Sequence, residues 1–153
     1  MASLNYRKGL CLSLTIKLQD GVSVETNGNQ TLAKRRKADN SEKLSQLVVK
    51  GMQEKKALGI VVMDLRKVKN AVADFFVIGS GNSSKQLDAI ADSVDDEVYK
   101  GLKESPWHTE GKSNKEWMLL DYASVVVHIF KKDIRNFYAL EKLWGDAEIT
   151  EFE

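Results

Sequence analysis

Two apolar segments that are separated by only two residues constrain the fold of this chain more than any other feature. Residues 117–122 and 125–130 are each long enough for one strand, and Ala123-Ser124 lies between them. Strands joined by two residues form a β-hairpin, and the turn fixes their register. The hairpin predicts three facing pairs of apolar residues: Tyr122 with Val125, Leu120 with Val127, and Met118 with Ile129.

The two faces of this hairpin differ in character, because side chains of a strand alternate between faces. The six paired residues form a uniformly apolar face, which we assign to the core. The other face mixes aromatic, aliphatic and ionisable side chains: Trp117, Leu119, Asp121, Val126, His128 and Phe130. A solvated face would carry Thr, Lys and Glu, whereas aromatic residues with scattered polar groups are typical of protein interfaces. We interpret it as a protein-binding surface; the alternative is that a helix covers it and Asp121 bonds to His128 in the core.

The rest of the chain predicts helices and strands that alternate in a mixed order. Helical spacing of apolar residues predicts helices over residues 41–57, 84–102 and 134–144. Apolar runs predict strands over 60–65 and 74–78, and a short extended segment covers 107–110. Nearly continuous apolar strands indicate a sheet covered by helices. With the hairpin, we expect an α/β or α+β domain, built on a mixed five-stranded sheet flanked by helices.

Three regions along the chain differ in composition. We expect a flexible extension over residues 1–40, one folded domain over 41–145, and a short acidic tail over 146–153. No acidic residue precedes Asp20, a composition that suits a targeting peptide as well as a tail or a start codon upstream of the true one. The basic run Lys34–Lys37 is either a solvated linker or a peripheral contact to RNA phosphates.

Charge and cysteine usage exclude several classes of protein. The net charge is +1, from 23 basic and 22 acidic residues. A protein that binds RNA mainly through phosphates would be much more basic. Cys11 is the single cysteine, so an internal disulfide and a thiolate metal cluster are excluded. No apolar run approaches the roughly 18 residues that span a bilayer. We expect a cytoplasmic protein, or an organellar one if the extension is a targeting peptide.

The candidate catalytic motifs are incomplete. The glycine- and serine-rich segment 79–84 precedes a helix, where backbone amides could hold an anion, but it lacks the third glycine of a dinucleotide fingerprint and the lysine of a P-loop. A tight turn with Ser83 or Ser84 as helix cap is the preferred interpretation.

The titratable residues give no stronger indication of catalysis. Asp88, Asp92 and Asp96 form a ridge one helical turn apart, which is typical of solvated surface. His108 and His128 have no nucleophile motif nearby. We therefore expect no catalysis, no cofactor and no metal.

Five stretches, taken in order, resemble the ribosomal silencing factor family (RsfS/Iojap). They are residues 73–84, 110–111, 117–122, 125–130 and 135–144, and the resemblance spans residues 41–145, about two-thirds of the chain. The resemblance implies a fold similar to nucleotidyltransferases without their metal-binding acidic pair. The family usually has Gly-Asp where this chain has Ala123-Ser124, so the turn is expected to be wider here.

The resemblance also implies a function. Family members bind a conserved large-subunit ribosomal protein (the fourteenth) and block the small subunit sterically, which lowers translation when nutrients are short; homodimers are also reported. Two alternatives stay open: a large-subunit assembly factor, especially in an organelle, and an enzyme related to nucleotidyltransferases. The family's partner-contacting positions correspond to Trp117, Asp121, His128, Arg135 and Tyr138.

Together with Leu119 and Phe130 from the hairpin face, these residues form the predicted partner-binding set. We expect Trp117 and Phe130 to be apolar anchors, and Asp121 and Arg135 to make charged contacts.

Overall fold

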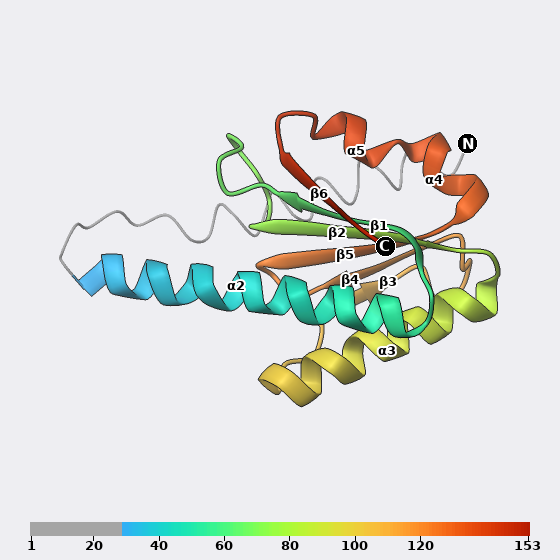
Figure 1. The fold of residues 1–153 in the computed structure, drawn as a ribbon, viewed down its shortest axis with the longest axis horizontal. Coiled ribbons are helices and arrows are strands. Elements are labelled where there is room, and N and C mark those ends of the chain that lie inside the picture. Colours follow the sequence, from blue (N-terminus) through green and yellow to red (C-terminus); the bar gives the residue numbers. More distant parts are fainter. Residues whose placement is uncertain (1–28) are drawn as a thin grey trace.

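A computed structural model describes residues 29–153, with the side chains of residue 37 and of residues 39–153. A single mixed sheet lies between two layers of helices, with α2 and α3 on one face and α4 and α5 on the other (Figure 1). The expected targeting segment or flexible extension falls largely on residues 1–28, outside the described residues. None of the helices in the part that is described is long and apolar enough to cross a membrane.

The sheet contains six strands in the order β3-β4-β5-β2-β1-β6. Their bounds are β1 (Leu58–Asp64), β2 (Phe75–Gly81), β3 (His108–Glu110), β4 (Trp117–Asp121), β5 (Val125–Lys131) and β6 (Glu148–Phe152). The central pair β2–β5 is parallel and the other pairs are antiparallel. The mixed α/β class is confirmed. The predicted count of five strands is wrong, because the expected acidic tail contains β6, which pairs with β1.

The hairpin register is confirmed. Met118 pairs with Ile129 and Leu120 with Val127. The N–H of Tyr122 donates to the carbonyl of Val125 at 2.9 Å, so the turn is not widened. Ala123 instead adopts a left-handed φ of 69°, a conformation that costs an L-residue about 1–2 kcal/mol.

The two long helices cover one face of the sheet. α2 (Asn29–Glu54) begins earlier than the predicted residue 41, because the preceding residues include good helix formers and no glycine or proline. It ends at Glu54, before the predicted end at residue 57, and Lys56 has a left-handed φ of 54°. α3 (Ser84–Leu102) has the predicted bounds, and the Ser83 side chain accepts a hydrogen bond from the N–H of Gln86.

The predicted C-terminal helix is divided into two. α4 (Lys132–Tyr138) and α5 (Leu140–Leu143) are separated by Ala139, which has a left-handed φ of 43°. The Ala139 N–H donates to the carbonyl of Arg135 and closes α4. Leu140, just after the break, is only 7% exposed and packs in the core.

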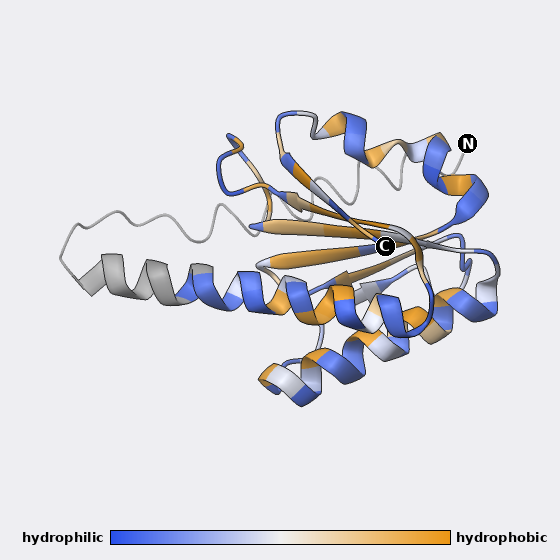
Figure 2. Ribbon diagram, in the orientation of Figure 1, coloured by the Kyte–Doolittle hydropathy of each residue, from blue (hydrophilic) through white to orange (hydrophobic). Residues whose placement is uncertain are grey.

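Each face of the sheet has its own apolar core. The α2–α3 side includes Leu44, Ile90 and Val127, and the α4–α5 side includes Met63, Phe76 and Phe130. Figure 2 shows the strands as largely hydrophobic and the helices as mixed, as expected for a sheet covered on both faces. A sheet of this kind leaves the helices and the sheet edges as the surfaces available to a partner.

Candidate functional site

The aromatic face of the hairpin is buried beneath α4 and α5. His128 and Leu119 are each 2% exposed, and Phe130 is fully buried. Trp117, Asp121 and Val126 are buried as well. The interpretation of this face as an open protein-binding surface is wrong. The alternative is right about the helical cover, but its bond between Asp121 and His128 is absent, because Nδ1 of His128 accepts from Trp117 and Nε2 has no partner among the described residues. A period of two shows which side chains share a face, but it does not show what packs on that face.

Trp117 is the centre of this buried cluster. Its ring stacks on Phe130 with centroids 5.0 Å apart and contacts Tyr138 of α4 at 4.6 Å. Its indole Nε1–H donates to Nδ1 of His128 at 3.1 Å. Trp117 therefore joins the hairpin to α4 through ring packing and joins the two strands through a buried hydrogen bond.

His128 is a neutral core residue. Because Nδ1 accepts from Trp117, the ring proton belongs on Nε2, which has no hydrogen-bond partner among the described residues. The ring meets Phe76 edge-on at 4.9 Å. Burial lowers the pKa of His128 to about 3, so it carries no charge at neutral pH. The Oδ1 of Asp121 accepts from the N–H of Ala123 at 2.8 Å, which places this carboxylate on the hairpin turn.

Arg135 connects α4 to the sheet and to α5. Its Nη1 donates to the carbonyl of Gly59 at 2.6 Å and to Oγ of Ser80 at 3.1 Å. Its Nε and Nη2 donate to Oε1 of Glu141 at 2.8 and 2.7 Å. The side chain is 17% exposed. These contacts give the guanidinium a structural role within the chain, in place of the expected charged contact to a partner.

Large apolar side chains are exposed on the outer side of the same two helices. Phe137 is 71% exposed and Leu143 is 52% exposed. Tyr138 lies beneath them, partly buried, with its ring 5.3 Å from that of Phe137 and 4.6 Å from that of Trp117. We call Phe137, Leu143 and the partly buried Ile134, Tyr138 and Trp144 the α4–α5 surface. Exposed aromatic and aliphatic residues over a rigid base are typical of protein contact sites.

Phe137 and Leu143 are absent from the set of binding residues that the sequence predicts. The sequence pattern places Phe137 in the apolar stripe of the last helix, and a stripe does not separate a buried side from an exposed one. One signal was available: the apolar residues of segment 134–144 are too many to fit on one buried face of so short a helix.

The glycine- and serine-rich segment is explained by packing. Gly79 and Gly81 lie within β2 rather than in a loop. A Cβ atom at Gly81 would lie 2.7 Å from Cδ1 of Leu87, and one at Gly79 would lie 2.9 Å from Sδ of Met52. The N–H of Asn82 donates to Oε1 of Gln86 at 2.8 Å. The expected helix cap is confirmed at Ser83, and the glycines provide room for core side chains.

The acidic ridge of α3 is a surface feature. Asp88 pairs with Lys115 at 2.6 Å, and Asp92 and Asp96 are exposed. Among the described residues, no group of three or more His, Cys, Asp or Glu side chains could hold a metal ion. The geometry of residues 37–153 thus offers its clearest candidate site in the α4–α5 surface.

Sheet order, helix placement and this exposed surface define a mixed α/β domain with a candidate protein-contact face. The chain belongs to the family described as "ribosomal silencing factor during starvation", whose model matches residues 38–153. That match includes β6, so the C-terminal strand is part of the family domain.

Individual relatives agree with this assignment. The Ribosomal silencing factor RsfS of Halalkalibacterium halodurans is 41% identical over 117 residues, which cover 74% of this chain and 96% of the relative. The mouse "Mitochondrial assembly of ribosomal large subunit protein 1" is 40% identical over 74 residues, which cover 46% of this chain and 32% of the relative. A crystal structure of a Chromobacterium violaceum protein is similar, with a TM-score of 0.64, 28% identity, and coverage of 68% of this chain and 85% of that one.

Proposed function

We propose that the protein binds the large ribosomal subunit and prevents the small subunit from joining it, so that translation is repressed. The observation that supports the proposal is the α4–α5 surface in a chain whose relatives are named ribosomal silencing factors. Steric occlusion requires only a binding surface, with neither turnover nor cofactor. The structural explanation of the glycines at 79 and 81 weakens the nucleotidyltransferase alternative.

Two exposed residues that the sequence did not predict and the residues of the predicted set have different roles in this proposal. Phe137 and Leu143 are the apolar anchors, because they are the exposed members of the surface. Tyr138 supports them from the sheet side and retains a partner-facing edge. Four buried residues lie beneath this surface: Trp117, Leu119, His128 and Phe130. The partly buried Arg135 holds α4 to the sheet, and the buried Asp121 holds the hairpin turn.

The partner on the large subunit is, in this proposal, its fourteenth protein, as the resemblance to the family implies. The same two helices carry exposed charged residues of both signs, Lys132, Asp133 and Lys142, which suit the polar rim of a protein interface. We place any contact to rRNA at the periphery, because the net charge of +1 is too small for a phosphate-dominated interface. The free protein is proposed to be a cytoplasmic homodimer.

Co-sedimentation on sucrose gradients tests the proposal. The wild-type chain is mixed with separated subunits, and reassociation is measured after the small subunit is added. We expect migration with the large subunit alone and a reduced yield of joined ribosomes. Phe137→Ala should weaken binding by roughly tenfold or more, as for an interface anchor. Failure of the wild-type chain to bind the large subunit would overturn the proposal.

Tyr99→Ala provides the matched control for Phe137→Ala. Tyr99 is also an exposed aromatic residue, at 53%, but it lies on α3 at the opposite face of the sheet. We expect this variant to bind as the wild type does. If Tyr99→Ala weakens binding and Phe137→Ala does not, the contact lies on the α2–α3 side.

A role in assembly of the large subunit is the second candidate function. The name of the mouse relative favours it, although that relative shares only part of its length with this chain. This function predicts that the chain binds immature large-subunit particles more tightly than mature ones. Gradient fractions from cells that are assembling ribosomes would distinguish the two.

A further inference from the structure

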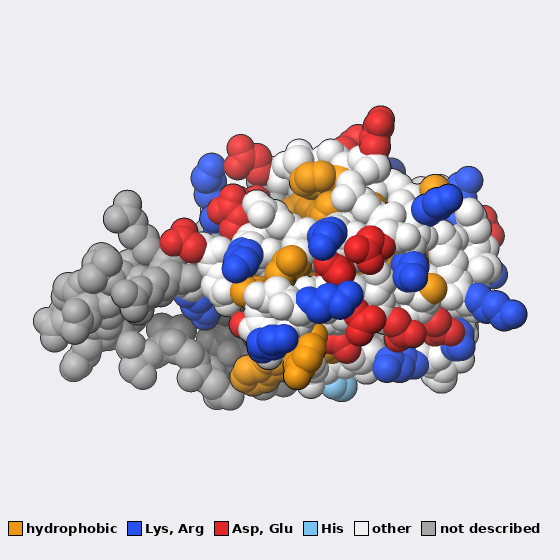
Figure 3. All heavy atoms as spheres, turned by 60° about the horizontal axis from the view of Figure 1, so that its bottom comes forward, with side chains coloured by type: hydrophobic (Ala, Val, Ile, Leu, Met, Phe, Trp, Pro, Cys, Tyr) orange, Lys and Arg blue, Asp and Glu red, His pale blue; other side chains and the backbone are white. Residues whose placement is uncertain are grey.

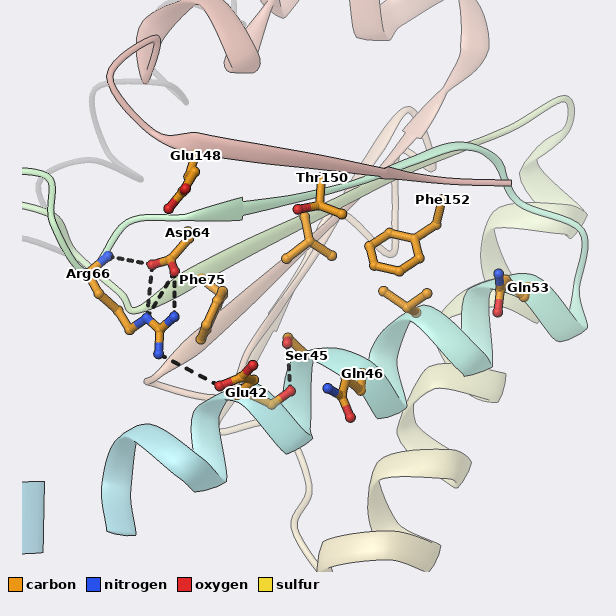
Figure 4. A pocket seen from close by; sticks show the side chains of 12 residues that line it. Glu42, Ser45, Gln46, Gln53, Asp64, Arg66, Phe75, Glu148, Thr150 and Phe152 are labelled. Atoms are coloured by element: carbon orange, nitrogen blue, oxygen red, sulfur yellow. Dashed lines mark hydrogen bonds and ion pairs between the residues drawn. The ribbon is translucent and has the colours of Figure 1, made fainter. Parts of the chain in front are cut away.

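A cleft lies between α2 and the edge of the sheet formed by β1 and β6, away from the α4–α5 surface. Its volume is about 320 Å³, within the usual size of small-molecule sites. Figure 4 shows α2 along one wall and β6 along the other. Apolar side chains line its inner part: Val49, Val62, Phe75 and Phe152.

The arrangement of helices leaves this cleft open. α3 packs mainly against β2, β4 and β5, whereas α2 contacts β1 and, with β6, lines the cleft. β6 is an edge strand with all five residues exposed. It is held by its antiparallel pairing with β1, and Nε2 of Gln53 donates a hydrogen bond of 2.8 Å to the carbonyl of Glu153, just after the strand. The strand therefore forms one wall of the cleft, in which Phe152 is 36% exposed while Val49, Val62 and Phe75 are at most 9% exposed.

Acidic side chains outnumber basic ones among the residues that line the cleft. Arg66 donates to both carboxylate oxygens of Asp64 at 2.5–3.0 Å, and its guanidinium lies 4.7 Å from the centroid of the Phe75 ring. This pairing holds the pKa of Asp64 below its ordinary value, so Arg66 and Asp64 neutralise each other.

Two further carboxylates line the cleft from opposite walls. Glu42, on α2, lies 3.8 Å from Nη1 of Arg66, and Glu148, on β6, contacts only the largely exposed Lys67 among the ion pairs described. Exposed pairs at such distances contribute little. An anionic ligand would meet both carboxylates, whereas a cation would be attracted to them.

We propose that this cleft is a binding site for a small organic cation, an ammonium or guanidinium group carried on an aromatic or aliphatic body. The apolar body lies along Val49, Val62 and Phe152, and the cationic group faces Glu42 and Glu148, which lie on either side of the Arg66–Asp64 pair. The polar side chains of Ser45, Gln46 and Thr150 line the same space and set the orientation of the ligand. This site is independent of the proposed ribosome contact, which uses the opposite face of the sheet.

The test compares two probes of similar size and opposite charge. Phenethylamine and phenylacetate are each titrated into the isotope-labelled full chain, and amide and methyl shifts are followed by NMR. We expect phenethylamine to bind in the millimolar range typical of a fragment and at least about tenfold tighter than phenylacetate. The largest shifts should come from Val49, Val62, Thr150 and Phe152. Equal affinity for the two probes, or shifts centred elsewhere, would overturn the proposal.

Two variants test separately whether binding requires the space in the cleft and the charge of its carboxylates. Thr150→Trp fills the cleft from an exposed strand position where an aromatic residue is well tolerated, and it should abolish phenethylamine binding. The double variant Glu42→Gln/Glu148→Gln should weaken binding about tenfold while the fold is kept. Its control is Asp92→Asn/Asp96→Asn, which removes two exposed carboxylates from α3 and should bind as the wild type does. Unchanged binding in the double cleft variant would contradict the assigned charge preference.

Figure 3 shows the face of α2 and α3, where acidic and basic side chains intermingle. This mixture suits a solvated surface, and it contrasts with the cleft, where an apolar floor meets two weakly partnered carboxylates.

Discussion

Replacement of Trp117 distinguishes a buried support from a surface anchor. The side chain is 6% exposed, so truncation to alanine removes most of a large buried ring and leaves a cavity beside Phe130 and Tyr138. Buried Phe or Trp to Ala changes cost about 3–5 kcal/mol of unfolding free energy. His128 also loses its hydrogen-bond donor, which adds about 1–3 kcal/mol for an unsatisfied buried group if the site does not relax. We expect a loss of at least about 3 kcal/mol.

A milder change makes the effect measurable even if Trp117→Ala does not fold. Trp117→Phe keeps a ring over Phe130 but removes the Nε1–H that donates to Nδ1 of His128. The expected loss is roughly 1–3 kcal/mol, from the unpaired nitrogen and a smaller void. Urea unfolding followed by far-UV circular dichroism gives both values without relying on tryptophan fluorescence.

Trp107→Ala is the matched control, because Trp107 is 78% exposed. Its unfolding free energy should differ from the wild type by no more than about 0.5 kcal/mol. The reasoning is refuted if Trp117→Ala unfolds within about 1 kcal/mol of the wild type and yet loses ribosome binding. That result would mean that Trp117 is accessible to the partner.

Three further predictions follow from individual contacts. Between pH 6.5 and about 3 the unfolded state binds a proton at His128 and the folded state does not. The unfolding free energy of the wild type should therefore decrease as the pH is lowered, by up to about 1.4 kcal/mol per unit. His128→Gln should show a smaller decrease in urea unfolding at the same pH values, and parallel curves would contradict the assignment. Arg135→Ala should cost roughly 1–3 kcal/mol by thermal unfolding, since it leaves Glu141 without its partner, whereas the exposed Lys132→Ala should change little. Ala123→Gly should raise stability by up to about 1 kcal/mol, because glycine accepts a φ of 69° without strain; a lower melting temperature would show that the turn is relaxed.

Local patterns were sufficient for much of the fold. The apolar spacing of residues 84–102 and the cap at Ser83 predicted α3 with its bounds. The two-residue connection between the apolar segments predicted the register of β4 and β5. These features depend on residues that are close in the chain, where periodicity and turn length leave few alternatives.

Long-range contacts accounted for the errors in the fold. The acidic composition of residues 146–153 indicated a tail, but the segment forms β6 because Ile149 and Phe152 pair opposite Met63 and Ile60 of β1. The final helix was predicted as one element, whereas Ala139 breaks it and Leu140 enters the core. The partner strand β1 lies far from β6 in the sequence, so local propensity could not identify that pairing.

The sequence by itself determined which side chains share a face of the hairpin and how its strands pair. Only the tertiary structure decided that α4 and α5 cover the face of Trp117 and His128, that Arg135 holds α4 to Gly59, and that Phe137 and Leu143 are exposed. The physical reason is that alternation along a strand fixes the direction of each side chain only relative to the strand's own backbone. Whether water, a helix or a partner occupies that side depends on segments elsewhere in the chain and on the free energy of burying them.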